Sequence, residues 1–133
     1  MSNPRRRILV IDDEPHIISV LVLKLKNAGY EVHTASDGEE GLAVAIAERP
    51  DLVITDYSMP YLSGLELCKK LKEAPETALV PALMLTARGL GLSSEDLEGT
   101  NVVAVVSKPF SPRELLTKIG KLLESMVGGG NEA

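Results

Sequence analysis

The sequence predicts a three-layer, doubly wound α/β domain built around a parallel five-stranded sheet. Short apolar runs alternate with longer helical patterns, the runs are mostly apolar at nearly every position, and 133 residues suit one domain. Strands buried on both faces, as in parallel sheets covered by helices, are apolar at nearly every position. Because alternating elements give parallel strands joined by right-handed crossovers, we expect five βα units.

The five predicted strands are short. Tyr30–Ala35 alternates between apolar and polar residues more than the others, so we place it at an edge of the sheet. The other four runs are nearly continuous, and we expect both of their faces to be buried. These runs are Ile8–Ile11, Leu52–Ile54, Ala82–Leu85 and Val102–Val106.

The predicted helices carry start and stop signals. The first, Pro15–Ala28, has Pro at its first turn and stops at Gly29. The last begins with a capping box of Ser111 and Glu114 and runs to about Met126. We therefore expect a domain over residues 1–127 and a flexible tail at 128–133. The helices between them are one that starts at Asp37–Glu40 and ends near Glu48, then Gly64–Glu73 and Ser94–Glu98.

The composition argues against several classes of protein. The net charge of −5 argues against a nucleic-acid binder that neutralises phosphates, and Arg5–Arg7 is interpreted as a solvated lead-in to the first strand. No apolar run approaches the ~20 residues of a membrane span, and we see no signal peptide. Cys68 is the only cysteine, which indicates a reducing, cytoplasmic compartment and a packed side chain. We expect neither nucleic acid nor membrane as a partner.

Four of the predicted strands end in polar residues that have no structural need to be there. Asp12 and Asp13 follow the first strand, and Asp56 follows the third. Thr86 ends the fourth strand and Lys108 ends the fifth. Because ligands bind at the carboxyl ends of parallel strands, this edge of the sheet is the candidate site.

These side chains favour phosphoryl transfer assisted by Mg²⁺. Carboxylates that lie close together repel one another unless a cation joins them. The donor atoms are all oxygen, with no His or Cys nearby, which suits Mg²⁺ rather than zinc or copper. The lysine supplies a compact charge for a phosphoryl oxygen, and a carboxylate can be the nucleophile that becomes an acyl phosphate.

At these residues the sequence resembles the receiver (CheY-like) domain of two-component response regulators. The resemblance covers roughly residues 6 to 126. Each motif alone is common, but four motifs in order, each at a predicted strand end, are specific. The matching segments are Val10–Pro15, Asp51–Pro60 followed by Gly64, Thr86-Ala87 and Lys108–Phe110. The resemblance implies a flavodoxin-like fold with the strand order 2-1-3-4-5.

The resemblance also implies a magnesium site. Asp13 would ligate Mg²⁺ directly, and Asp12 directly or through water. Asp56 would contact the ion as well, and Ser58 would offer its backbone carbonyl.

The same resemblance implies the parts of a phosphorylation switch. Asp56 would be the phosphoacceptor, and Lys108 would pair with the phosphoryl group, aimed by a cis peptide bond to Pro109. Thr86 would turn its hydroxyl toward the phosphate. The donor would be a phosphohistidine on a sensor histidine kinase or histidine phosphotransfer protein, and the output an unidentified protein target. We expect a monomer or weak homodimer that catalyses only its own phosphorylation and dephosphorylation, either stand-alone or a piece of a longer protein.

Three features depart from the family pattern. Val105 stands where the family often has an aromatic residue that moves inward with the threonine on activation. Arg88 lies two residues after Thr86, at a position that in the family tunes the loss of the acyl phosphate. The glycines of Gly89–Gly91 predict a short and mobile fourth helix.

Three further side chains have two interpretations each. Leu23 is expected to face away from the core of the first helix, as part of a partner surface or as a scattered aliphatic. His16 and His33 are expected to face solvent rather than to act as ligands, because neither lies at the carboxyl end of a strand.

Other functions fit these residues less well than a phosphoacceptor does. The main alternative is a pseudo-receiver that binds a partner without being phosphorylated. An aspartyl-phosphate phosphohydrolase would need a second Asp two residues after the nucleophile, where this chain has Ser58. A flavodoxin-like nucleotide binder would need a phosphate-binding loop after the first strand, where Asp12–Glu14 would repel a phosphate.

Overall fold

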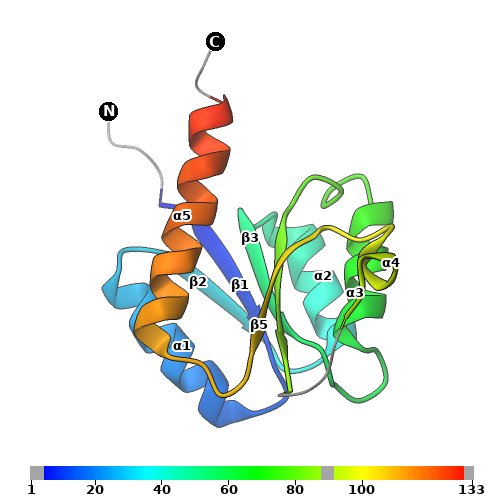
Figure 1. Cartoon of the computed structure of the whole chain (residues 1–133), viewed down its shortest axis with the longest axis horizontal. Coiled ribbons are helices and arrows are strands. Elements are labelled where there is room, and N and C mark those ends of the chain that lie inside the picture. Colours follow the sequence, from blue (N-terminus) through cyan, green and yellow to red (C-terminus); the bar gives the residue numbers. More distant parts are fainter. Residues whose placement is uncertain (1–4, 88–91, 131–133) are drawn as a thin grey trace.

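The computed structural model describes residues 5–87 and 92–130, with side chains as far as residue 125. Five parallel strands form one sheet in the order β2-β1-β3-β4-β5, with helices on both faces (Figure 1). The predicted fold class, layers and strand order are confirmed. The strands are β1 (Arg7–Ile11), β2 (Glu31–Ala35), β3 (Leu52–Asp56), β4 (Ala82–Thr86) and β5 (Val102–Ser107). The helices are α1 (Pro15–Asn27), α2 (Gly38–Glu48), α3 (Gly64–Glu73), α4 (Ser94–Leu97) and α5 (Pro112–Gly130).

Two apolar cores lie on the two faces of the sheet. Helices α1 and α5 cover one face, where Leu25 and Ile119 are fully buried against β1 and β3 (Figure 1). Helices α2 and α3 cover the other face, where Leu67 and Leu71 are fully buried. Each aliphatic side chain of this size stabilises the fold by about 1.5–3 kcal/mol when it leaves water. The central strands β3 and β4 are buried at every position, so the residues at their ends are held on a rigid frame.

The two edges of the sheet differ from each other. Tyr30–Ala35 was predicted as an edge strand, and β2 does lie at the edge. Strand β5 is the other edge, and the expectation that both of its faces are buried is wrong: Val103 is 55% exposed and Val105 is 39% exposed. The preceding helix, α4, has only four residues and is too short to cover this face. The predictions for Arg88 and for mobility at Gly89–Gly91 lie outside the described residues.

The helix ends follow the sequence signals only in part. Gly29 has a left-handed φ of 99°, as the stop signal predicts, and α1 ends at Asn27, one residue before the predicted Ala28. Helix α5 runs to Gly130, beyond the expected end near Met126, because glycine weakens a helix without forbidding it. The tail predicted from residue 128 is therefore helical as far as Gly130. Across the described residues, no helix is both long and apolar enough to cross a membrane.

Candidate functional site

The sheet register brings the ends of β1 and β3 together. The two strands pair as far as Ile11 and Thr55, so the residues that follow, Asp12 and Asp56, are neighbours at the carboxyl edge. Asp12 is fully buried and Asp56 is 6% exposed. Two carboxylates are therefore held side by side with little access to water.

The ends of β4 and β5 bring the other predicted side chains to this edge. Thr86 pairs with Ser107, and the backbone N–H of Lys108 donates to the Thr86 carbonyl at 2.6 Å. The Lys108–Pro109 peptide bond is cis, as the resemblance implied. The four strand ends identified from the sequence thus meet in space.

A single ammonium group joins three carboxylates at the centre of the site. The Lys108 Nζ lies 3.3 Å from Asp12 Oδ2 and 3.2 Å from Asp56 Oδ1. It also lies 3.1 Å from Glu14 Oε1, and the oxygens of the three acids are within 4.8 Å of one another. When all three acids are ionised, three negative charges face one positive charge, which leaves two negative charges uncompensated.

Burial and neighbouring charges shift the pKa values of the groups in this cluster. Burial raises the pKa of Asp12, and burial together with the adjacent Asp12 charge raises the pKa of Asp56. Burial alone would lower the pKa of Lys108, but the hydrogen bond to Glu14 and the charges of the two aspartates outweigh it and raise that pKa to about 12. The lysine is therefore charged at neutral pH, and the carboxylates favour an additional cation.

The hydroxyl of Thr86 is a second sign of an incomplete site. The residue is fully buried at the end of β4, and its Oγ1 has no hydrogen-bond partner among the described residues. An unsatisfied buried hydroxyl costs about 1–3 kcal/mol. A group that enters the site and accepts a hydrogen bond from Thr86 would recover that free energy.

A glycine lets the chain turn closely behind Asp56. A Cβ atom added at Gly64 would lie 2.2 Å from the backbone oxygen of Asp56, closer than any side chain tolerates. The N–H of Gly64 donates to the Tyr57 carbonyl at 2.8 Å, which closes the loop between β3 and α3. The glycine in the sequence motif is therefore needed for close approach of helix α3 to the strand end.

Glu14 is the member of the cluster that sequence reasoning missed. The expected ligand Asp13 is exposed, and the compact cluster at this edge of the sheet is Asp12, Glu14 and Asp56. Glu14 is the N-cap residue of α1, where its side chain makes no capping hydrogen bond and reaches Lys108 instead. Its N–H donates to Asp12 Oδ1 at 2.9 Å. Ser58 lies exposed in the loop after β3.

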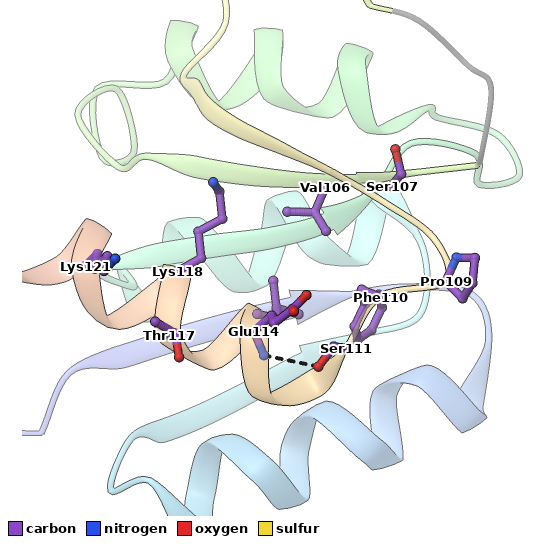
Figure 2. A pocket seen from close by; sticks show the side chains of 10 residues that line it. Val106, Ser107, Pro109, Phe110, Ser111, Glu114, Thr117, Lys118 and Lys121 are labelled. Atoms are coloured by element: carbon purple, nitrogen blue, oxygen red, sulfur yellow. Dashed lines mark hydrogen bonds between the residues drawn. The ribbon is translucent and has the colours of Figure 1, made fainter.

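A groove beside Lys108 is separate from this cluster. It has a volume of about 440 Å³ and lies between β5 and α5, where Ser107, Pro109, Lys118 and Lys121 line it (Figure 2). Its rim includes the start of α5, where Ser111 Oγ accepts the Glu114 N–H at 3.3 Å. This bond is one half of the predicted capping box, and the reciprocal bond is absent from the described residues.

Cys68 and the surface of α1 agree with the sequence-based expectations. Cys68 is fully buried between α3 and the sheet, and burial raises the pKa of its thiol to about 12. It is therefore a packing residue. Leu23 is 59% exposed on α1, as predicted.

Known proteins similar to this chain include several transcriptional regulators. The chain is 40% identical over 126 residues to the alkaline phosphatase synthesis transcriptional regulatory protein PhoP of Bacillus subtilis, covering 89% of this chain and 48% of PhoP. It is 39% identical over 119 residues to RpaA of Synechocystis, a DNA-binding dual master transcriptional regulator, covering 88% of this chain and 48% of RpaA. The chain thus spans about half the length of these curated relatives.

These relatives correct one expectation. Nucleic acid was excluded as a partner because of the net charge of −5. That charge describes the surface of this domain, and RpaA is named as DNA-binding although about half of it aligns with this chain. The exclusion is therefore wrong.

Solved structures and a family match agree on the domain. Chemotaxis response regulator CheY4 of Vibrio cholerae superposes with a TM-score of 0.81 at 32% identity, covering 89% of this chain and 98% of CheY4. A CheY-like response regulator receiver domain protein of Methanospirillum hungatei superposes with a TM-score of 0.85 at 30% identity, covering 95% and 99%. Residues 8–120 match the family described as response regulator receiver domain. With its fold, its acidic edge and these matches, the chain belongs to the response regulator receiver domain family.

Proposed function

We propose that Asp56 accepts a phosphoryl group from a phosphohistidine on a sensor histidine kinase or histidine phosphotransfer protein. Membership of the receiver family makes the chain a signalling module of two-component systems rather than a metabolic enzyme. The observation that carries the proposal is the buried carboxylate pair of Asp12 and Asp56, bridged by Lys108 at the carboxyl edge. This arrangement concentrates negative charge around one nucleophile and supplies an ammonium group next to it.

The donor set fits Mg²⁺. All of the candidate side-chain ligands are carboxylate oxygens, and the cluster carries two uncompensated negative charges when ionised. We assign Asp12, Asp13, Asp56 and the backbone carbonyl of Ser58 as the groups that would hold the ion, with Glu14 as a further carboxylate within reach. When bound, Mg²⁺ would neutralise charge on the phosphoryl oxygens.

The protein groups perform the transfer by position and charge. A carboxylate oxygen of Asp56 forms a bond to phosphorus as the bond from phosphorus to the donor imidazole nitrogen breaks, and that nitrogen keeps the electron pair. The Lys108 ammonium, which the three carboxylates now share, pairs with a phosphoryl oxygen. The unpaired Thr86 hydroxyl donates to another phosphoryl oxygen. The product is an acyl phosphate on Asp56.

The signal leaves the site without the aromatic residue that the family often uses. Val105 occupies that position, and its side chain is 39% exposed on β5. We infer that movement of Thr86 toward the phosphate is transmitted through the backbone, because the Thr86 carbonyl accepts the Lys108 N–H at 2.6 Å. The ends of β4 and β5 would then shift together and change the surface that an output partner contacts.

Intact mass after incubation with acetyl phosphate and Mg²⁺ tests the proposal. We expect one added phosphoryl group on the wild type and none on Asp56→Asn. The matched control is Asp51→Asn. Asp51 lies just before the first residue of β3, at the opposite end of that strand from Asp56, and pairs with Arg6 at 3.6 Å. This variant should gain the group as the wild type does. Chelation of Mg²⁺ should abolish the gain.

Two outcomes would contradict the proposal. Equal labelling of the wild type and Asp56→Asn would place the acceptor elsewhere. A wild type that takes no phosphoryl group from acetyl phosphate or from a phosphohistidine donor would instead be a pseudo-receiver that acts by binding.

A further inference from the structure

A second cluster of metal-ligand side chains lies at the β2 edge of the sheet, away from the phosphoryl site. Glu31 and His33 come from β2, and Glu48 is the last residue of α2. One ligand atom from each lies within 4.8 Å of the other two. Glu31 pairs with Arg7 at the start of β1, whereas Asp12 follows the end of that strand. The two clusters therefore lie toward opposite ends of the sheet.

The fold explains why these three side chains meet. Side chains two apart on a strand point to the same face, so Glu31 and His33 share the face of Ala35, which packs into the core under α2. Helix α2 ends at Glu48 because Arg49 takes the left-handed conformation, with a φ of 49°. The end of the helix thus places Glu48 over the exposed part of β2.

An arginine contacts the side chain of Glu31 and the backbone of Glu48. The Arg7 Nε lies 3.1 Å from Glu31 Oε2, and its Nη1 donates to the backbone carbonyl of Glu48 at 2.8 Å. Arg7 and His33 contact the same oxygen, Glu31 Oε2, which has two lone pairs, so it can keep Arg7 and bind a metal ion in place of the His33 hydrogen bond. The Glu31 side chain and the Glu48 backbone are therefore ordered before an ion binds, which reduces the entropy lost on binding.

The distances are close to those of a coordination sphere. His33 Nε2 lies 2.7 Å from Glu31 Oε2 and 3.8 Å from Glu48 Oε1. Ligand atoms about 2.0–2.1 Å from a tetrahedral zinc ion stand roughly 3.3 Å from one another. Shifts of about half an ångström in each pair, through side-chain rotation, would therefore convert the hydrogen-bonded cluster into a metal site.

The burial of the cluster suits a site that an ion can enter. The sequence suggested that His33 faces solvent, but its side chain is only 29% exposed and lies between the two glutamates. The Glu31 and Glu48 side chains are 40% and 41% exposed. An imidazole with two carboxylates suits Zn²⁺ and its neighbours in the first transition row, whereas Mg²⁺ prefers oxygen ligands alone.

We propose that Glu31, His33 and Glu48 form a binding site for a zinc-class divalent ion that joins strand β2 to the end of helix α2. Water completes the coordination, because the protein supplies three ligands. The site is independent of Asp56 and of the phosphoryl-transfer proposal. Its ion stabilises the folded state, since β2 is an edge strand that the ion would tie to the helix above it.

Zinc titration of the wild type, followed by NMR of the histidine ring nitrogens, tests the site directly. Excess Mg²⁺ is present throughout to occupy the carboxylate cluster at the other end of the sheet. The chain has two histidines, and His16 is exposed on α1, so it serves as an internal reference. We expect the Nε2 resonance of His33 to shift with saturation at one equivalent and the resonances of His16 to stay in place.

Calorimetry on variants measures the contribution of each ligand. His33→Gln should weaken zinc binding at least about 10-fold, and Glu48→Gln by a smaller factor of roughly 3 to 10. His16→Gln is the matched control and should bind as the wild type does. Zinc should raise the Tm of the wild type and of His16→Gln but not that of His33→Gln.

The proposal is overturned if His33 and His16 respond alike, or if neither responds. Equal zinc affinity of the wild type and His33→Gln would also overturn it. Circular dichroism shows whether each variant is folded. The ring-nitrogen titration uses the wild type alone, so it tests the site even if His33→Gln does not fold.

Discussion

Two clusters of charged side chains lie toward opposite ends of the sheet and differ in how their charges are balanced. At the carboxyl edge, Asp12 and Asp56 are buried, share one lysine, and have pKa values raised chiefly by burial. At the start of β2, the Glu31 side chain is 40% exposed, and its pKa is lowered chiefly by the hydrogen bond to His33, with a further contribution from Arg7. Both clusters contain carboxylates, and burial decides whether the pKa of a carboxylate is raised or lowered.

The difference shows which cluster depends on a ligand that the protein does not supply. The carboxyl-edge cluster has an excess of negative charge in a buried place, so a cation or the relocation of Lys108 to a phosphate changes its free energy strongly. In the β2 cluster, Glu31 pairs with Arg7 and hydrogen-bonds His33 in a more solvated place, where ion pairs contribute little. Changes at the first cluster should therefore have larger effects than matched changes at the second.

The largest effect is expected at the glycine behind Asp56. Gly64→Ala would place a Cβ atom 2.2 Å from the Asp56 carbonyl oxygen, so α3 must move away from the strand end. We expect the free energy of unfolding in urea to fall by about 3 kcal/mol. Gly120→Ala on α5 is the control, since the nearest atom to its Cβ is 4.0 Å away, and it should be neutral or slightly stabilising. Equal stability of the two variants would contradict the packing described here.

Removal of the shared lysine should have the next largest effect. Lys108→Met leaves the buried aspartates without their cation, so we expect a loss of about 2 kcal/mol in the absence of divalent ions. Mg²⁺ should increase the free energy of unfolding of Lys108→Met by more than it increases that of the wild type. The matched change at the β2 cluster, Arg7→Gln, should cost below about 1 kcal/mol because its ion pair is exposed. A larger loss for Arg7→Gln would reverse the comparison.

Removal of one carboxylate should stabilise the metal-free protein. Asp56→Asn takes away a buried charge that repels Asp12, so we expect a gain of about 1 kcal/mol, or roughly 4 °C in Tm, without divalent ions. Thermal melts with and without Mg²⁺ measure it. A loss of stability in the metal-free variant would show that Lys108 already satisfies the cluster.

The sign of the pH dependence follows from the same shift. The folded-state pKa of Asp56 lies above its unfolded value, so the folded state binds more protons between these two values. Stability of the metal-free wild type should therefore fall as the pH rises through that window, relative to Asp56→Asn. A difference between the two proteins that stays constant with pH would contradict the raised pKa.

The smallest effect is expected at Glu31. Glu31→Gln removes a charge that is exposed and paired with Arg7 and His33, so stability at neutral pH should change by less than about 0.5 kcal/mol. Chemical denaturation of Glu31→Gln, measured alongside Asp56→Asn, tests this prediction. A change as large as that of Asp56→Asn would show that exposure does not separate the two clusters.

The sequence predicted which strand ends form the site better than it predicted the contacts of single side chains. Continuous apolar runs predict the central strands, and the rule that ligands bind at strand ends predicts that Asp12, Asp56, Thr86 and Lys108 lie together. Glu14 was missed because its direction depends on the backbone at the first turn of α1, where it makes no capping bond.

Two other features depend on distant parts of the chain. The exposure of β5 could not be predicted, because it depends on how far the four-residue helix α4 covers the sheet. The environment of His33 depends on where α2 ends over β2, which the local pattern around His33 does not contain. Local periodicity therefore defined the elements, and packing between elements decided the surroundings of single side chains.

Carbon-13 NMR titration of the side-chain carboxyl groups, in the absence of divalent ions, tests the central comparison most directly. We predict that Asp12 and Asp56 titrate above the ordinary aspartate value of 3.8 and that Glu31 titrates below the ordinary glutamate value of 4.5. Aspartates that titrate at or below 3.8 would contradict the comparison, because the carboxyl edge would then be fully balanced by Lys108 and would not favour a further cation.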